Sequence, residues 1–275
     1  MYKLIVCDVD GTLLDHSFDF NQADKTAIAM AQEKGVKIAL CSGRSHKSLK
    51  DFAKSLGINA QNNYIIGFNG GLIYDMQTEK VVLETTLDKQ AAIEIVRCYL
   101  NTRREIEIAI YMDGENLLFE KGSKYLRKYQ ETSKADVAET TDILAATKNL
   151  PSLSKILFIG ENHDLKAFED ELYLAGIKNA SIFFTAHYLL QAGPETSSKG
   201  SGLKWLCDKL GFSTSQTIAI GDNYNDLSMI EAAGLGVAVS NAVSAAKDIA
   251  NYITQNSCTT GAVAETINKF VLSKS

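Results

Sequence analysis

Two carboxylates stand two positions apart near the start of the chain, in Asp8-Val9-Asp10-Gly11-Thr12, directly after the apolar run of residues 4–7. Carboxylates about 4 Å apart repel each other by about 4 kcal/mol at an effective dielectric constant of 20, so a fold that keeps them together needs a neutralising partner. A cation is the obvious partner, and phosphate chemistry is the obvious use. The alternative is that Asp-Gly-Thr only forms a turn and the entry of a helix.

A second polar segment, Ser42-Gly43-Arg44, follows the apolar run of residues 36–41. Its hydroxyl and adjacent backbone N–H groups could hold phosphoryl oxygens. Ser-Gly-Arg is also a common turn. The segment therefore indicates a phosphate site only if it lies beside the segment of Asp8 and Asp10. In open parallel sheets ligands bind outside the carboxyl ends of the strands, which is where both segments would project.

Lys199 stands at the predicted start of a helix, a position where the helix dipole disfavours a cation. A merely solvated lysine is the alternative interpretation. This residue is oddly placed, and it could supply positive charge to a site of carboxylates and phosphate.

The segment from Gly221 to Asp226 places Asp222 and Asp226 four positions apart, directly after the apolar run of residues 217–220. Like charges at this spacing destabilise an isolated helix by about 0.2–0.5 kcal/mol, and a bound metal would compensate for the repulsion. Oxygen ligands without Cys or His favour a hard cation. Mg²⁺ fits best, because it takes one or two carboxylates and keeps water and phosphate as further ligands.

The elements that must position these residues alternate between strand and helix. The pattern predicts strands at residues 4–7, 36–41 and 64–66, with helices at 21–33 and 45–56 between them. Continuous apolar strands joined by helices indicate a parallel sheet covered on both faces. The same pattern returns near the end of the chain, with helices predicted at 202–210, 227–233, 242–250 and 262–271 and strands at 217–220 and 235–239.

The period changes between these two parts. A hairpin is predicted at residues 72–74 and 81–83, and a strand at 106–110 alternates as a half-buried strand does, which suggests a sheet with one wet face. Further elements follow as helices at 89–100 and 165–175 and strands at 155–159, 181–184 and 188–191. Residues 82–190 are therefore predicted to form a separate, inserted α+β domain.

Composition restricts the kinds of molecule that the protein is expected to bind and the cellular compartment in which it is expected to work. The chain has 275 residues, enough for one large domain or two smaller ones, and a formal net charge of -5. Binding of nucleic acid or of an anionic membrane needs clustered Lys and Arg, so neither is expected. Five cysteines without a Cys-x-x-Cys pair, no secretory leader and no apolar stretch of roughly 20 residues predict a cytoplasmic, reduced protein.

Taken together, these segments resemble the motifs of haloacid dehalogenase-like phosphatases, of the Cof-type subfamily with a type IIB cap. The resemblance covers essentially the whole chain and rests on residues 8–14, 42–44, Asn69-Gly70, Lys199-Gly200 and 221–226. It implies an α/β fold, with a doubly wound, Rossmann-like parallel-sheet core made of residues 1–81 and 191–275. Residues 82–190 would be the inserted α+β cap, which would set substrate specificity.

The resemblance also implies roles for individual residues. Asp8 would attack phosphorus and become a transient aspartyl phosphate, while Asp10 would act as acid and then base. Mg²⁺ would be held by Asp8, the Asp10 carbonyl and Asp222. Phosphate oxygens would be bound by Ser42, by the N–H groups of Val9 and Gly43, and by Lys199 and Asn225, with Arg44, Asn69 and Asp226 in support.

The expected function is Mg²⁺-dependent hydrolysis of small phosphorylated metabolites, sugar phosphates or similar monoesters. A phosphomutase with the same covalent step is the first alternative, and a non-catalytic metabolite-binding protein is the second. In the insertion, Tyr111, Tyr125 and Arg127 are possible contributors to specificity, although core packing or surface exposure is the favoured role for each. The sequence predicts neither the substrate nor the oligomeric state.

Overall fold

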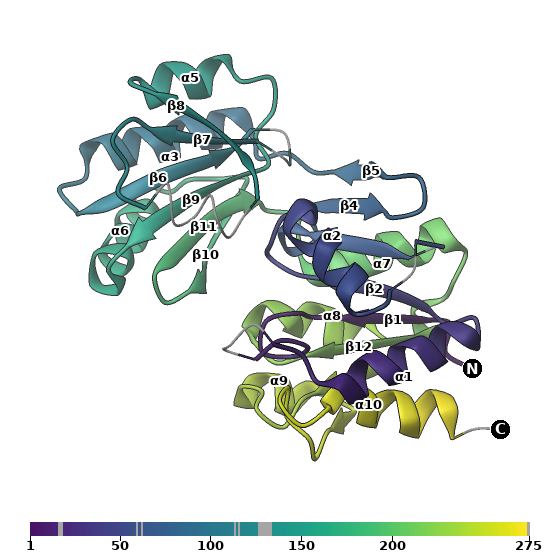
Figure 1. Cartoon of the computed structure of the whole chain (residues 1–275). Helices are drawn as coiled ribbons and strands as arrows, with labels where there is room; N and C mark the ends of the chain where they lie inside the picture. The colour runs from purple at the N-terminus through teal and green to yellow at the C-terminus, as the bar shows by residue number, and fades with distance from the viewer. Residues whose placement is uncertain are drawn as a thin grey trace. The chain divides into compact units, whose positions relative to one another are not determined.

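The computed structural model of the chain describes residues 1–15, 19–58, 60–61, 63–112, 114, 116–125 and 134–273. These residues form two compact units. The first contains Met1–Leu83 and Ser198–Ser275, and the second contains Glu84–Ser197. Each unit is built on a sheet of its own (Figure 1).

The first unit contains an eight-stranded sheet in the order β14-β13-β12-β1-β2-β3-β4-β5. Neighbouring strands from β14 to β3 are parallel, and β4 pairs with β3 in the antiparallel direction. The strands are β1 (Leu4–Cys7), β2 (Lys37–Cys41), β3 (Tyr64–Gly67), β4 (Leu72–Asp75), β5 (Lys80–Glu84), β12 (Thr217–Gly221), β13 (Leu235–Ala238) and β14 (Tyr252–Ile253). The carboxyl ends of β12, β1, β2 and β3 therefore meet at one edge of the sheet.

Helices cover both faces of this sheet, as the doubly wound interpretation predicts. On one face α7 (Lys199–Leu210) and α8 (Leu227–Ala232) contact each other, and their apolar side chains join those of β1, β2, β3 and β12 in one core cluster. On the other side α1 (Gln22–Glu33) contacts β2 and α10 (Ala262–Ile267). The remaining helices of the unit are α2 (His46–Ser55), α9 (Ser244–Ile249) and the short turns η1 (Phe68–Gly70), η2 (Thr214–Gln216), η3 (Tyr224–Asp226) and η4 (Asn268–Leu272).

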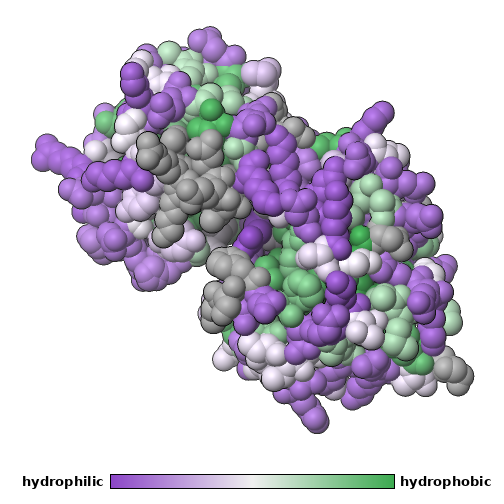
Figure 2. All heavy atoms as spheres, in the orientation of Figure 1, coloured by the Kyte–Doolittle hydropathy of each residue, from purple (hydrophilic) through white to green (hydrophobic). Residues whose placement is uncertain are grey.

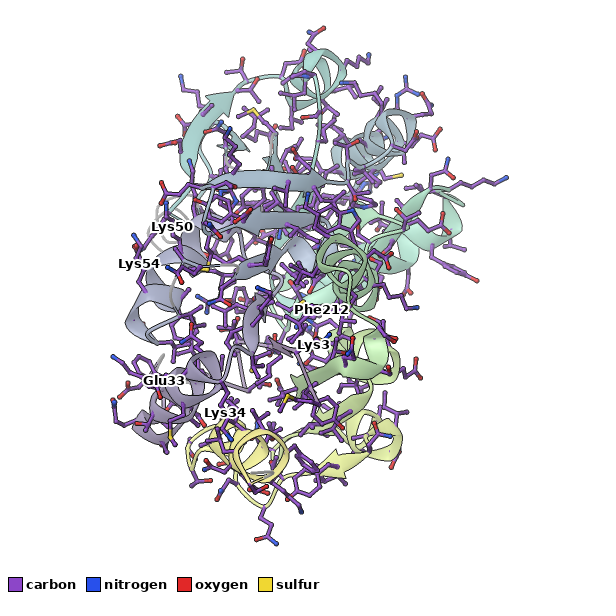
Figure 3. All side chains as sticks on the ribbon, turned by 90° about the vertical axis from the view of Figure 1, so that its right-hand side faces the viewer. Lys3, Glu33, Lys34, Lys50, Lys54 and Phe212 are labelled. Carbon is purple, nitrogen blue, oxygen red and sulfur yellow. The ribbon has the colours of Figure 1, made fainter. Side chains whose placement is uncertain are left out.

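Helix α1 is fastened to the C-terminal helices near both of its ends. Near its start, the Asp24 carboxylate accepts a hydrogen bond from the Ala264 N–H at 2.6 Å. Beyond its end, the Lys34 ammonium donates to the Leu272 carbonyl at 3.2 Å (Figure 3). The last part of the chain thereby holds the first helix against the sheet.

Asp24 makes the stability of this unit depend on pH. Its side chain is fully buried, its Oδ2 has no hydrogen-bond partner among the residues that the structure describes, and burial raises the pKa of the carboxyl to about 6. Between the unfolded pKa of about 3.9 and the folded value of about 6, the native state holds the extra proton. The contribution of Asp24 to stability therefore falls by about 3 kcal/mol as the pH rises through this window, and does not change further above it. Urea unfolding of wild type and Asp24→Asn at pH 4.5 and 7.5 should show that the variant loses much less stability; equal pH dependence would exclude Asp24 as the cause.

The second unit contains a six-stranded sheet in the order β10-β11-β9-β6-β7-β8, antiparallel except between β7 and β8. Helices α3 (Lys89–Asn101), α5 (Ile143–Asn149) and α6 (Asn162–Leu174) share one apolar cluster with one face of the sheet. The strands are β6 (Ile106–Tyr111), β7 (Asn116–Glu120), β8 (Asp136–Thr140), β9 (Lys155–Gly160), β10 (Ala180–Ala186) and β11 (Leu189–Pro194). The insertion is therefore an α+β unit, as its change of period indicated.

The prediction of one wet face for this sheet is wrong. The face opposite the helices carries Tyr111, Phe119 and Leu157, each at most 1% exposed. The reason lies in β7 and β9, which are apolar at most positions and so present apolar side chains on both faces. The alternation of polar and apolar residues that suggested a wet face occurs in β6 and is not repeated in its neighbours β7 and β9.

The boundaries of the insertion also differ from those predicted. The predicted return to the core at residue 191 falls inside β11, which is hydrogen-bonded to β9 and β10 in the second sheet. The predicted start at residue 82 falls inside β5, which belongs to the first sheet. The two compact units divide instead after Leu83 and before Ser198, because sheet pairing rather than the change in period decides where each unit ends.

Hydrophilic side chains cover much of the molecular face in Figure 2. Among the described residues, no helix combines the length and apolar character that a membrane crossing requires.

Candidate active site

A buried lysine lies between two carboxylates at the carboxyl edge of the first sheet. Lys199 is the first residue of α7, and Asp8 follows β1. The Lys199 ammonium donates to Asp8 Oδ1 and to Asp226 Oδ1, each at 2.5 Å, and its side chain is 0% exposed. These two carboxylates explain how a cation is tolerated at a helix start, where the dipole opposes it.

Charge in this cluster is not balanced by the protein alone. Among the described residues, the ion pairs of this cluster join one ammonium group, that of Lys199, to Asp8 and Asp226, and an oxygen of Asp222 lies within 4.8 Å of both carboxylates. Burial raises the pKa of the Asp8 carboxyl well above its usual range, and repulsion from Asp226 adds to this. Burial and Asp226 likewise raise the pKa of Asp222. Burial alone would lower the pKa of Lys199, but attraction to Asp226 and Asp8 outweighs it and raises the pKa.

Asp222 is held against the loop that follows β1. It comes directly after β12, and the Thr12 hydroxyl donates to its Oδ1 at 2.8 Å. Gly11, with a φ of +89°, lets the loop pass close by, because a Cβ there would lie 2.5 Å from Asp222 Oδ2. The two acidic segments of the sequence thus meet through Thr12 and Gly11.

Asp226 uses both of its oxygens within the protein. Oδ1 accepts from Lys199, and Oδ2 accepts from the N–H groups of Asp222 and Asn223, each at 2.9 Å. Its side chain therefore fixes both the ammonium group and the turn that presents Asp222.

The acidic cluster fits a divalent cation. One oxygen from each of Asp8, Asp222 and Asp226 lies within 4.8 Å of the others. An oxygen-only donor set suits hard cations such as Mg²⁺ and Ca²⁺, and a dication would favour the ionised form of the carboxyl groups whose pKa values burial and mutual repulsion raise. Because the oxygens of Asp226 are already hydrogen-bonded, Asp8 and Asp222 are the better direct ligands.

Asp10 lies apart from this cluster and pairs with Arg44. The guanidinium binds its carboxylate in a bidentate manner, with Nε donating to Oδ2 at 2.8 Å and Nη2 to Oδ1 at 2.5 Å. The Asp10 side chain is 48% exposed. An exposed carboxylate held in a fixed orientation can exchange protons with a bound molecule and with water.

The segment after β2 places Ser42 and Gly43 beside η1. The Ser42 hydroxyl accepts from the Arg44 N–H at 3.2 Å, and its carbonyl accepts from the Asn69 N–H at 3.0 Å. Asn225 Nδ2 donates to Asn69 Oδ1 at 3.0 Å. Segments after β2, β3 and β12 are therefore joined by hydrogen bonds.

Val9 shapes the loop between the two first carboxylates. Its side chain is fully buried, and its carbonyl accepts from the Leu13 and Leu14 N–H groups at 3.0 and 2.8 Å. The turn is thus fixed on both sides of Asp10.

Two residues in this arrangement were not among the predicted site residues. Thr12 bonds Asp222, and its place in the first motif was the available signal. Asn241 carried no signal in the sequence. Its Nδ2 donates to the Gly11 carbonyl at 2.7 Å and its Oδ1 accepts from the Cys258 N–H at 3.0 Å, so it anchors the loop that carries Asp10.

The structure describes two of the three residues of the insertion that were considered for specificity. Tyr111 is buried in β6, with the Lys155 ammonium 5.0 Å from its ring centre, so it is a packing residue of the sheet. Tyr125 donates its backbone N–H to Glu107 at 3.2 Å. Arg127 lies outside the described residues.

Known proteins resemble this chain over nearly its whole length. Residues 5–267 match the family model of haloacid dehalogenase-like hydrolases. Two relatives from Bacillus subtilis are phosphatase YwpJ, 27% identical over 92% of this chain and 94% of its own, and 5-amino-6-(5-phospho-D-ribitylamino)uracil phosphatase YwtE, 29% identical over 92% and 93%. A solved haloacid dehalogenase-like hydrolase from Bacteroides thetaiotaomicron is 32% identical over 98% of this chain and 99% of its own, with a TM-score of 0.84. The family predicted from the strand-end motifs is confirmed: the chain belongs to the haloacid dehalogenase-like hydrolases.

Proposed function

We propose that this protein is a Mg²⁺-dependent phosphatase that hydrolyses small phosphate monoesters, such as sugar phosphates, through an aspartyl phosphate. The observation that carries the proposal is the buried contact of Asp8 with Lys199 inside a cluster of three carboxylates. Stability alone does not favour such an arrangement, since buried like charges are costly unless a ligand compensates them. The names of the two Bacillus relatives add support, and one of them specifies a phosphorylated metabolite.

In the first step, Asp8 would attack phosphorus in line. A bond forms between its carboxylate oxygen and phosphorus, and the bond from phosphorus to the ester oxygen breaks. Asp10 would donate its proton to the leaving oxygen, which departs as an alcohol. In the structure this carboxyl is 48% exposed and both of its oxygens accept from Arg44, so part of that pairing would have to open for Asp10 to carry the proton.

In the second step, Asp10 would take a proton from water as the water oxygen attacks the phosphorus of the aspartyl phosphate. The bond between Asp8 and phosphorus breaks, which releases inorganic phosphate and restores the Asp8 carboxylate. The two steps use one residue as acid and then as base, so the enzyme ends in its starting protonation state.

Asp8, the Asp10 carbonyl and Asp222 would hold Mg²⁺, which would supply positive charge to the transferring phosphoryl group. Lys199 would bind a phosphoryl oxygen and orient Asp8, with Asp226 holding the ammonium in place. Ser42 and the N–H groups of Val9 and Gly43 would bind the remaining phosphoryl oxygens, and Asn225 would contact phosphate or a metal-bound water.

The second unit would act as a cap that selects the substrate. A separate α+β unit, inserted between β5 and α7 of the first, suits a closed chamber and a small molecule rather than a large phosphoprotein. Cys7, Cys41 and Cys207 are buried free thiols, which suit the reducing cytoplasm in which we place the enzyme.

A panel of phosphorylated metabolites, assayed by release of inorganic phosphate with Mg²⁺ and with EDTA, tests the proposal. We expect turnover of one or more monoesters with Mg²⁺ and loss of turnover with EDTA. Full activity in EDTA would refute the metal requirement. Conversion of a hexose 1-phosphate to its 6-phosphate without phosphate release would indicate a phosphomutase, and binding without turnover would indicate a metabolite-binding protein.

Replacing Asp10 by Asn should slow turnover by about 10²- to 10⁴-fold, the usual contribution of acid–base catalysis. In Asp10→Asn the rate of the phosphorylation burst should fall less with p-nitrophenyl phosphate than with an alkyl phosphate. The reason is that p-nitrophenolate can leave without being protonated. Rapid-quench measurements on both esters check this. An equal loss of the burst rate for both would mean that Asp10 is not the acid.

A further inference from the structure

The turn after β3 has an unusual backbone. Phe68 and Asn69 have φ values of 51° and 54°, and Gly70 follows with 95°. Left-handed conformations of residues other than glycine cost of order 1–3 kcal/mol, persist only where the surroundings enforce them, and are concentrated at functional sites. Asn tolerates this conformation better than most residues. An Asn at position 69 therefore suits the left-handed turn and places its side-chain amide there.

The surroundings hold this turn firmly. The Phe68 and Asn69 N–H groups donate to the carbonyls of Arg44 and Ser42 at 3.1 and 3.0 Å. At Gly70 a Cβ would lie 1.9 Å from the Ser198 carbonyl oxygen, so the turn packs directly against the start of α7. Asn69 therefore sits between the segment that carries Ser42 and the helix that begins with Lys199.

The side-chain amide of Asn69 is only half used. Its Oδ1 accepts a hydrogen bond from Asn225 Nδ2 at 3.0 Å, which identifies the other terminal atom as the NH₂ donor. That Nδ2 is buried and has no hydrogen-bond partner in the part of the chain that the structure describes, and the residue is 3% exposed. A buried donor without a partner is costly, so it is expected to find one when the site is filled.

The unpartnered donor lies beside Gly43. A Cβ on Gly43 would be 3.2 Å from Asn69 Nδ2, which places the amide next to the Ser42-Gly43 segment. The neighbouring groups of this edge are the donors of the proposed phosphate site, and an oxyanion would supply the acceptor that this additional N–H donor lacks.

We propose that Asn69 is a phosphate-binding residue, whose Nδ2 donates a hydrogen bond to an oxygen of the phosphoryl group. The proposal rests on the proposed function and adds a direct contact to a residue that the sequence assigned only a supporting part. The bond between Asn69 and Asn225 fixes which end of the amide faces the phosphate.

Two substitutions separate this role from a structural one. Asn69→Asp keeps the size, the tolerance of a left-handed backbone and the acceptor for Asn225, but puts a carboxylate oxygen where the donor was. Asn69→Gly keeps the turn and removes the side chain. A residue that only held the turn would tolerate Asn69→Gly, and one that acted only through its bond to Asn225 would tolerate Asn69→Asp, which keeps that acceptor.

The measurement is the dissociation constant of inorganic phosphate in the presence of Mg²⁺, by calorimetry, together with KM for the best monoester. We expect Asn69→Gly to weaken phosphate binding and raise KM by about 10- to 100-fold, the range for a hydrogen bond to a charged group. Asn69→Asp should bind phosphate more weakly still, because its carboxylate repels phosphate. The exposed Asn268 provides the matched control, since Asn268→Asp should leave both constants unchanged.

Phosphate affinity within about twofold of wild type in folded Asn69→Asp, or in Asn69→Gly should the first variant fail to fold, would overturn the proposal. Failure of the proposed function looks different, because wild type itself would then neither bind inorganic phosphate nor hydrolyse any monoester.

Discussion

Replacing Asp8 by Asn is expected to abolish phosphate release, with a loss of at least about 10³-fold, the scale on which removing a catalytic nucleophile acts. An amide cannot form the acyl phosphate, yet it keeps an oxygen that can accept from Lys199. Asp226 remains as the second acceptor of the ammonium, at 2.5 Å in the native protein. Folding should therefore survive, since the substitution removes one of three buried carboxylates.

Two measurements check this result. Phosphate release measures turnover, and mass spectrometry of acid-quenched enzyme should find a phosphoryl adduct on the Asp8 peptide of wild type only. Asp208→Asn is the matched control, because Asp208 is an exposed residue of α7 and its replacement should leave turnover intact. Turnover retained without Asp8 would remove it as the nucleophile.

Replacing Lys199 by Met should affect stability as well as activity. The ammonium is fully buried between Asp8 and Asp226, and its removal leaves both carboxylates without their cation. Breaking a buried ion pair in this way costs about 3–5 kcal/mol. Chemical denaturation in EDTA should show a loss of this size, and phosphate release should be lost with it.

Lys204→Met provides the comparison, since Lys204 is an exposed residue of the same helix and its change should alter stability by at most about 0.5 kcal/mol. Adding Mg²⁺ to the Lys199 variant should return part of the lost stability, because a cation bound by the native acidic cluster stabilises it by mass action. Equal stability of both variants in EDTA would contradict the charge balance inferred for the cluster.

Much of the core could be predicted because its strands are short, apolar and closely followed by polar motifs. Residues 4–7, 36–41 and 217–220 each end at a cluster of functional groups, and a parallel sheet brings such ends together. The same logic predicts which segments lie near one another, but not which side chains form hydrogen bonds or ion pairs. The pairing of Asp10 with Arg44, and the link from Asn241 to Gly11, depend on loop geometry that no period or spacing contains.

The insertion was harder to predict for a physical reason. No element was predicted between residues 111 and 154, where the structure has β7, β8 and α5. β8 has mostly polar residues and lies at the edge of its sheet, so neither alternation nor a continuous apolar run marks it. At the other end, β11 continues beyond the predicted 188–191 to Pro194, and this extension moved the boundary of the unit.

The contact between Asp8 and Lys199 joins residues 191 positions apart, and that between Thr12 and Asp222 joins residues 210 apart. A chain emerging from the ribosome therefore exposes Asp8 long before Lys199 can reach it, whereas Arg44 follows its partner Asp10 after only 34 positions. An insertion that folds early would shorten the loop to be closed, although halving a loop saves only about 0.6 kcal/mol of closure entropy. The site cannot assemble before Asp226 has been synthesised, so shorter nascent forms of this hydrolase should not bind phosphate.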